Sequence, residues 1–161
     1  IGKVEDGARI VGPVSVGENS LIMSGSYIVG PVCIGDNCDI GPNAVILPGT
    51  SIGSNCTIEP FTRISNSILM KDVKIASFNN ISSSIIGEGV STGSHFIAEA
   101  GESRVEMDEA MMKANMGAAV GDNTEIAGRV LVKPGKVIGV RCRIGSGAII
   151  RENIPDNSRI V

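Results

Sequence analysis

The sequence has 161 residues, the length of one domain, and 14 basic against 17 acidic side chains give a formal net charge of -3. This balance does not favour binding to nucleic acid or to an anionic membrane. Only 2% of the residues are aromatic although 42% are hydrophobic, so a core must be built from small and branched aliphatic side chains. No apolar run reaches the roughly 18 residues of a spanning helix, and we expect a soluble, cytoplasmic protein.

A six-residue repeat begins at the first valine of the chain. Val or Ile recurs at every sixth position, namely at Val4, Ile10, Val16, Ile22, Ile28, Ile34, Ile40, Ile46, Ile52, Ile58 and Ile64. The residues four positions after the first ten of these are all small or β-branched. The same frame returns from Val120 to Ile150, so the repeat covers both ends of the chain.

The repeat predicts the fold. One branched aliphatic and one small residue in every six can fill a narrow triangular prism whose faces are short parallel strands, and three repeats form one coil of this prism. We therefore expect an all-β fold, a single-stranded left-handed parallel β-helix, although its connections break the right-handed rule for parallel strands. The frame slips by one residue between Ile64 and Leu69 and again at Ile86, which predicts two short corners of five residues.

The pattern lapses in the stretch AEAGESRVEMDEAMMKANMG, where we expect an excursion from the prism over residues 99–117. Met107, Met111 and Met112 suggest one or two helical turns within it. The simpler alternative is a solvated loop that packs on a neighbouring chain.

The cysteines and the single histidine argue against a metal site. The four cysteines form no CxxC pair and His95 is the only histidine, so zinc-ligand spacing is absent. Cys38, Cys56 and Cys142 occupy the small inner position of their repeats, where a thiol behaves as a small buried hydrophobe. Cys33 precedes an inward-facing aliphatic residue and should point outward, as the one thiol that reacts readily.

Several segments together resemble the hexapeptide-repeat acyltransferases. They are SGSYIVGPVCIGDNCDIGPNAVILPGT (24–50), ISNSILM (64–70), SSIIGEG (83–89), and MGAAVGDN (116–123) continuing through IGSGAII (144–150). The closer resemblance is to the carboxy-terminal half of two-domain sugar-1-phosphate nucleotidylyltransferases, especially archaeal enzymes that also N-acetylate glucosamine 1-phosphate. It implies that residues 1–161 are a β-helix domain from a longer chain, whose N-terminal nucleotidylyltransferase domain is absent from this sequence.

The resemblance also implies a homotrimer with three clefts, each of which binds acetyl-CoA and a sugar phosphate while a histidine acts as general base. The family's H-x-x-Y-x-G-D motif places that histidine at Ser77 and the tyrosine at Asn80. A family asparagine falls on Ala100, and the arginine and lysine that hold the sugar phosphate fall on Leu47 and Ser65. Five polar functional positions are therefore substituted, and Leu47 cannot replace a charge-assisted phosphate contact.

Three positions are compatible with a catalytic function. By the same resemblance, the CoA-lining positions fall on Gly128 and Ser146, which are still small, so a CoA-sized groove can persist without chemistry. His95 lies near the lost site and is a weak candidate for a relocated base. The alternative for His95 is a surface or interface histidine.

Three functions of different classes follow. The first is a domain that acts mainly in trimerisation of a glucose- or N-acetylglucosamine-1-phosphate thymidylyl- or uridylyltransferase, with a degenerate acetyltransferase site and no required cofactor. The second is an active sugar N-acyltransferase with an altered acceptor and acetyl-CoA as co-substrate, so whether this domain is itself an enzyme stays open. The third, a γ-type carbonic anhydrase, needs three histidines for each zinc ion and is disfavoured by the single histidine. The fold alone does not distinguish among these three functions, because the same prism carries all three activities.

Overall fold

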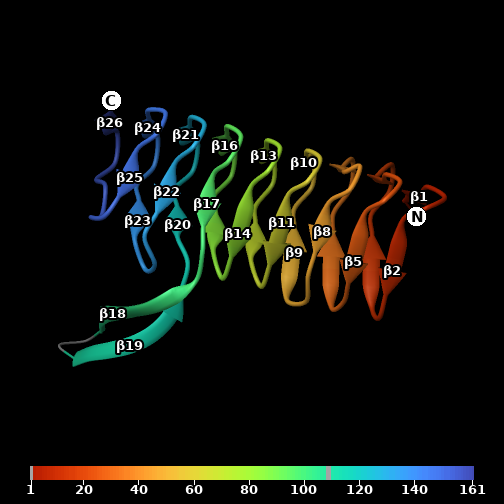
Figure 1. Cartoon of the computed structure of the whole chain (residues 1–161), viewed down its shortest axis with the longest axis horizontal. Coiled ribbons are helices and arrows are strands. Elements are labelled where there is room, and N and C mark those ends of the chain that lie inside the picture. Colours follow the sequence, from red (N-terminus) through yellow and green to blue (C-terminus); the bar gives the residue numbers. More distant parts are fainter. Residues whose placement is uncertain (1, 108–109) are drawn as a thin grey trace.

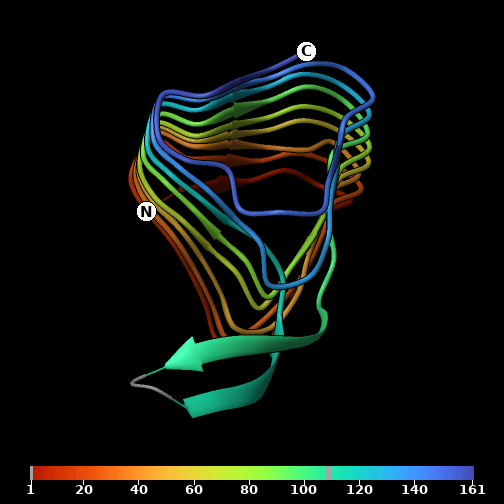
Figure 2. The same ribbon diagram turned by 90° about the vertical axis from the view of Figure 1, so that its left-hand side faces the viewer.

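The six-residue repeats fold into short strands that wind around a triangular prism, as the computed structural model shows for residues 2–107 and 110–161 (Figures 1 and 2). Sheet A contains β1 (Lys3–Val4), β4 (Leu21–Ile22), β7 (Asp39–Ile40), β10 (Thr57–Ile58), β13 (Lys74–Ile75), β16 (Ser91–Thr92), β21 (Glu125–Ile126), β24 (Arg143–Ile144) and β26 (Arg159–Ile160). Sheet B contains β2 (Arg9–Val11), β5 (Tyr27–Val29), β8 (Val45–Ile46), β11 (Arg63–Ser65), β14 (Asn80–Ser82), β17 (Ile97–Ala98), β22 (Leu131–Val132) and β25 (Ile149–Ile150). Sheet C contains β3 (Val14–Val16), β6 (Val32–Ile34), β9 (Thr50–Ile52), β12 (Ile68–Leu69), β15 (Ile85–Ile86), β20 (Ala119–Val120) and β23 (Val137–Ile138). The chain is a left-handed parallel β-helix, which confirms the predicted fold.

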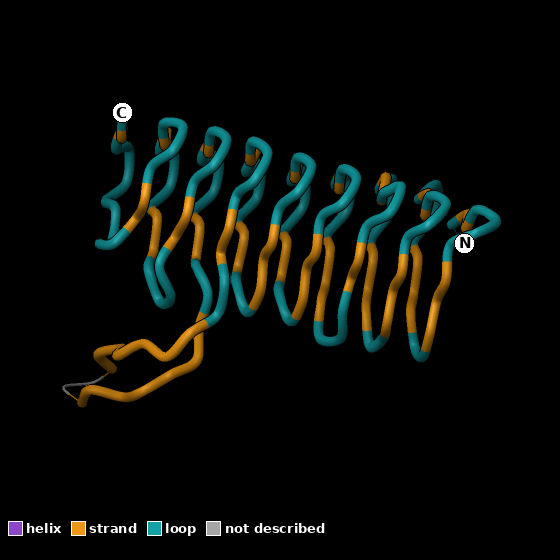
Figure 3. Tube along the Cα trace, in the orientation of Figure 1, coloured by secondary structure: helices purple, strands orange, loops and turns teal. Residues whose placement is uncertain are grey.

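The aliphatic residues of the repeat form the core. Ile22, Ile40 and Ile58 lie in register on adjacent strands of sheet A, and each is essentially inaccessible to solvent. The residues beside them on the same strands, such as Asp39, point outward. Because strand side chains alternate between the two faces of a sheet, each two-residue strand contributes one inward and one outward residue. The strands are joined by turns at three corners of the prism (Figure 3), which we name A–B, B–C and C–A after the sheets that they connect.

Two coils are shorter than the others. Strands of neighbouring coils usually pair at an offset of three full repeats, but β11 and β14 pair Arg63 with Asn80, and β12 and β9 pair Ile68 with Ser51, each at an offset one residue shorter. In these coils the B–C corner is turned through a single residue with positive φ, Asn66 in one and Ser83 in the next. The two predicted five-residue corners are confirmed.

The expected excursion is a β-hairpin. After Ala98 the chain leaves the B–C corner as β18 (Gly101–Met107) and returns as β19 (Ala110–Met116), which pairs antiparallel with it. The prism then resumes directly, because β20 pairs with β15. The helical turns predicted around Met107, Met111 and Met112 are wrong, since all three residues lie in strands. Within residues 2–107 and 110–161, no helix is long and apolar enough to cross a membrane.

One coil is packed differently from its neighbours. At the core positions of β16 and β17, Thr92 and Ala98 replace the usual isoleucine, and the fully buried ring of Phe96 occupies the coil between them. Asn79, in the preceding coil, is also buried. Its Nδ2 donates to Thr92 Oγ1 at 2.6 Å, and its Oδ1 accepts from the Phe96 N–H at 2.9 Å. The Phe96 ring and the hydrogen-bonded Asn79 amide thus fill the space that branched aliphatic residues fill elsewhere.

The cysteines lie as predicted. Cys38, Cys56 and Cys142 are buried and Cys33 is exposed. The Cys56 thiol donates to the Met70 carbonyl oxygen at 3.1 Å, and its hydrogen bond with Cys38 together with burial raises the pKa of this thiol. Cys56 is therefore a protonated core residue at neutral pH.

Candidate functional site

The candidate site residues lie along sheet B, but they divide between its two edges. Ser77, His95, Gly128 and Ser146 lie in turns of the A–B corner, whereas Leu47, Ser65 and Ala100 lie at the B–C side. Asn80 is the first residue of β14, next to the A–B corner. Within one chain the two groups are therefore separated by the width of the sheet.

The A–B corner carries a column of small residues. Ser77, Ser94, Gly128 and Ser146 are each the second residue after the core position of their sheet A strand, so they follow one another on successive coils. The turns are held together by backbone hydrogen bonds, for example from the Gly147 N–H to the Gly128 carbonyl oxygen at 3.0 Å. The sequence indicated only two members of this column as CoA-lining positions. The structure shows that Ser77, at which the resemblance implies a base, lies on the same column.

A stack of three aromatic rings lies beside this column. Phe61 and Phe78 stack with ring centroids 5.3 Å apart, and Phe78 and His95 stack at 5.1 Å. All three residues have φ near +60°, a conformation that costs a non-glycine residue about 1–2 kcal/mol. Phe61 and Phe78 are more than half exposed. Sequence reasoning missed this stack, although the three rings follow one another at an equal interval that matches the short coils.

His95 lies one coil from Ser77, the position at which the resemblance implies a base. Its backbone N–H donates to the Ser77 carbonyl oxygen at 3.2 Å, and its imidazole is exposed and stacks on Phe78. Among the described residues, no hydrogen-bond partner orients the imidazole in the way that a second group usually orients a general base. His95 as a base stays a prediction.

The outer face of sheet B holds a cation that the sequence did not indicate. Arg63, on β11, extends its Nη1 to within 3.3 Å of Asn80 Oδ1 and 3.5 Å of Ser65 Oγ. Asn80 and Ser65 are two of the positions that the resemblance predicts to be substituted, so Arg63 places one positive charge in the region where the resemblance implies a sugar phosphate. Leu47 is half-buried, and Ala100 donates its N–H to Ser82 Oγ at 3.0 Å at the base of the hairpin. Neither of them supplies a polar side chain.

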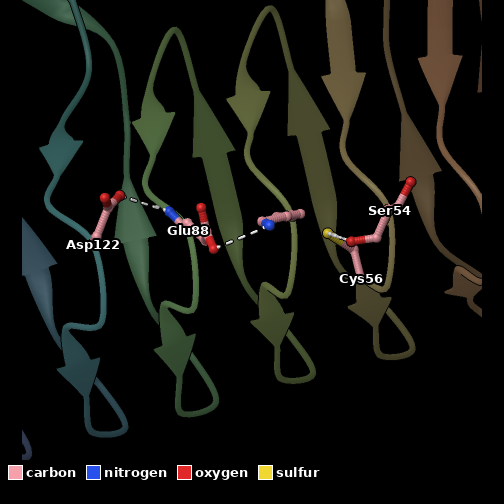
Figure 4. Close-up of polar contacts among 5 residues, drawn as sticks. Ser54, Cys56, Glu88 and Asp122 are labelled. Atoms are coloured by element: carbon pink, nitrogen blue, oxygen red, sulfur yellow. Dashed lines mark hydrogen bonds and ion pairs between the residues drawn. The ribbon is translucent and has the colours of Figure 1, made fainter.

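The charged side chains at the C–A corner have structural partners. Asp122 Oδ1 accepts the Glu88 N–H at 2.8 Å, and the Glu88 carboxylate lies 3.5 Å from Lys71 Nζ (Figure 4). Asp36 and Asp156 accept backbone N–H groups of the preceding coil in the same way. These carboxylates stabilise turns and do not converge on a reacting group.

Comparison with known proteins identifies a family and a relative. The family model described as GMPPB C-terminal domain matches residues 28–115. The chain is 29% identical over 108 residues to the bifunctional protein GlmU of Methanocaldococcus jannaschii, a match that covers 60% of this chain and only about a quarter (26%) of that protein.

Two solved structures are similar to this chain. The UDP-N-acetylglucosamine acyltransferase LpxA of Bacteroides fragilis is similar with a TM-score of 0.50 and 22% identity, over 94% of this chain and 68% of that one. PerB of Caulobacter crescentus, solved with CoA and GDP-perosamine, is similar with a TM-score of 0.39 and 18% identity, over 97% of this chain and 51% of that one.

Proposed function

Since this chain belongs to the GMPPB C-terminal domain family, we propose that it is the C-terminal hexapeptide-repeat domain of a cytoplasmic sugar-1-phosphate nucleotidylyltransferase. The parent enzyme transfers a thymidylyl or uridylyl group to glucose 1-phosphate or N-acetylglucosamine 1-phosphate in an N-terminal domain that precedes this one. The likeness to a bifunctional GlmU over 108 residues supports this arrangement. The role of the domain is mainly to hold subunits together as a homotrimer.

The observation that carries this proposal is the absence of titratable side chains at the positions where the resemblance implies them. At the positions where the resemblance implies a base and two phosphate-binding groups, the side chains are those of Ser77, Leu47 and Ser65. None of these groups titrates near neutral pH, so none replaces an imidazole or a cation. A prism whose site has lost these groups keeps its aliphatic faces and therefore keeps the capacity to assemble.

A second function is favoured by one specific arrangement. The Arg63 guanidinium lies beside Ser65 and Asn80, and Gly128 and Ser146, where the resemblance implies a CoA arm, are small residues on adjacent coils. This combination supports an acetyl-CoA-dependent sugar N-acyltransferase with an altered acceptor. In that case His95 of the A–B corner is the candidate base, and acetyl-CoA is a co-substrate.

Two measurements test the proposals. Sedimentation equilibrium of the purified chain should give three times the chain mass, and a mass equal to one chain would rule out the trimerising role. Binding of acetyl-CoA is measured first by calorimetric titration. A thiol-release assay with glucosamine 1-phosphate as acceptor then measures turnover, and we expect none. Turnover would instead establish the acyltransferase.

A matched pair of variants sharpens the second measurement. Arg63→Ala removes the cation beside Ser65, whereas Arg9→Ala removes the outward arginine of β2 on the same sheet, whose guanidinium lies over Tyr27. Any turnover that depends on a phosphorylated acceptor should fall with Arg63→Ala and persist with Arg9→Ala. Equal effects of the two substitutions would contradict a phosphate-binding role for Arg63.

A further inference from the structure

The hairpin β18–β19 has two chemically different faces. Strand register places Gly101 opposite Met116 and Ser103 opposite Ala114, and β-sheet alternation puts Met112 on this same face. The other face carries the ion pair between Glu102 and Lys113, at 2.8 Å, together with Arg104 and Asn115. One face is therefore uncharged and rich in methionine, and the other is charged.

The uncharged face is covered by its own prism only at its base. A Cβ on Gly101 would contact the Pro134 ring, and Ser103 lies against Gly135, so the first residues of β18 rest on the B–C corner of the next coil. Beyond that point the hairpin extends away from the prism and diverges from sheet C (Figures 1 and 2). Met112 is 55% exposed. A two-stranded hairpin is marginally stable alone in water, so this one needs a surface to pack on.

Sheet C offers the matching surface. Its outward-facing side chains carry no charge, being those of Ser15, Cys33, Ser51, Ile68, Ile85, Ala119 and Val137. The last four lie on the adjacent strands β12, β15, β20 and β23, and Ile68, Ile85 and Val137 are each nearly half exposed. The outward residues of sheet A include Lys3, Asp39, Lys74, Glu125, Arg143 and Arg159, and those of sheet B include Arg9 and Arg63. Sheet B also has uncharged outward residues in Ile97, Leu131 and Ile149, but sheet C is the sheet whose outward strand residues are all uncharged. Since burying an unpaired charge is costly, sheet C fits the uncharged face of the hairpin best.

We propose that the hairpin docks on sheet C of a second copy of this chain, with Met112 and Met116 covering the stripe formed by Ile68, Ile85 and Val137. The dimensions agree, because a seven-residue strand is about 20 Å long and four rungs of a sheet span about 15 Å. Every copy supplies one hairpin and one stripe, and the hairpin diverges from its own sheet C. This contact is head-to-tail, the type that forms a ring when the rotation between neighbouring copies closes. The proposal rests on the homotrimer proposed above and names the surfaces that build it.

Cross-linking between two distinguishable copies tests the contact. Chains with different affinity tags are co-expressed on a Cys33→Ser background, one carrying Met112→Cys and the other Ile85→Cys, and are then treated with a short bismaleimide. The expected product is a covalent dimer that carries both tags. The matched control is Met111→Cys paired with Ile85→Cys, because Met111 is exposed on the same strand but faces the charged side, and this pair should give no dimer.

The outcomes separate this proposal from the trimer itself. A trimeric mass without the two-tag dimer overturns the docking of the hairpin and leaves trimerisation intact. Equal cross-linking by Met111→Cys and Met112→Cys also overturns it, because the contact would then not depend on the uncharged face. A monomeric mass overturns both proposals. Loss of the oligomer in Met112→Glu, with the oligomer retained in Met111→Glu, supports the docking.

Discussion

Replacing Phe96 by alanine should open a cavity in the coil from which the hairpin leaves the prism. Phe96 is fully buried, and the core residues beside it are small. Thr92 is in register with Ile75 and Ile126, and Ala98 with Ile81 and Val132, so this coil has lost aliphatic volume that its neighbours keep. The phenyl ring supplies the missing volume, and no adjacent residue of the same coil can replace it.

The expected cost follows from the packing. Truncating a buried phenylalanine to alanine usually costs about 3–5 kcal/mol, and the cost is highest where the site cannot collapse. Here the spacing of the coils is set by backbone hydrogen bonds such as that from the Asn80 N–H to the Phe96 carbonyl oxygen at 3.0 Å, so collapse is limited. We expect a loss of about 4 kcal/mol in the free energy of unfolding, measured by urea denaturation. Because each coil contacts only its neighbours, hydrogen exchange should accelerate in residues 74–98 and 118–132 more than in residues 20–46.

Phe78→Asn is the matched control. Phe78 is about half exposed and has a φ of +61°, which asparagine adopts more easily than phenylalanine does. The loss of stacking, about 0.5–1.5 kcal/mol, is offset by relief of the backbone, so the net change should be below about 1 kcal/mol. If Phe96→Ala lowers the free energy of unfolding by no more than Phe78→Asn does, the phenyl ring does not compensate for the volume missing at Thr92 and Ala98.

Two further predictions concern the thiols and the close packing of the coils. Maleimide should label one cysteine in the native protein and four after denaturation, and Cys33→Ser should abolish the native label, because only Cys33 is exposed. Labelling of more than one thiol under native conditions would show that the prism opens. Gly121→Ala should lower the free energy of unfolding by about 1–3 kcal/mol, because its Cβ would lie 2.5 Å from the Gly139 carbonyl carbon. Gly147→Asn, where nothing lies within 4 Å and φ is +74°, should change the unfolding midpoint little, and a similar loss in both variants would contradict the steric explanation.

The fold could be predicted because its determinants are local in sequence. Each repeat carries its own inward residue and its own corner, so a periodic pattern such as Ile22, Ile40 and Ile58 defines the stacked sheets without any long-range information. The shortened coils were visible for the same reason. The shape of the excursion could not be predicted, because adjacent methionines such as Met111 and Met112 are compatible with a helix as well as with the two faces of a strand. Only pairing with β18 decides between them.

The candidate site was predicted less completely. The resemblance predicts which polar groups are absent, since that depends on identity at single positions such as Ser77 and Leu47, and this stays a prediction. It did not indicate that Arg63 reaches Ser65 and Asn80, because this contact depends on the conformation of a long side chain that crosses to the next coil. The volume exchange at Phe96 was missed because it involves compensation among several positions, none of which breaks the repeat alone.

The geometry of the prism explains how a catalytic site can be lost while the fold stays intact. Within each strand, the inward residue stabilises the core and the outward residue faces solvent or a partner, so substitutions at outward and corner positions such as Ser65, Ser77 and Asn80 leave the buried column unchanged. Stability and chemistry are therefore carried by different residues of the same repeat. In the docking that we propose, assembly depends on the uncharged outward residues of sheet C rather than on the polar positions of sheet B. The contact proposed for the hairpin is therefore independent of the side chains at the candidate site on sheet B.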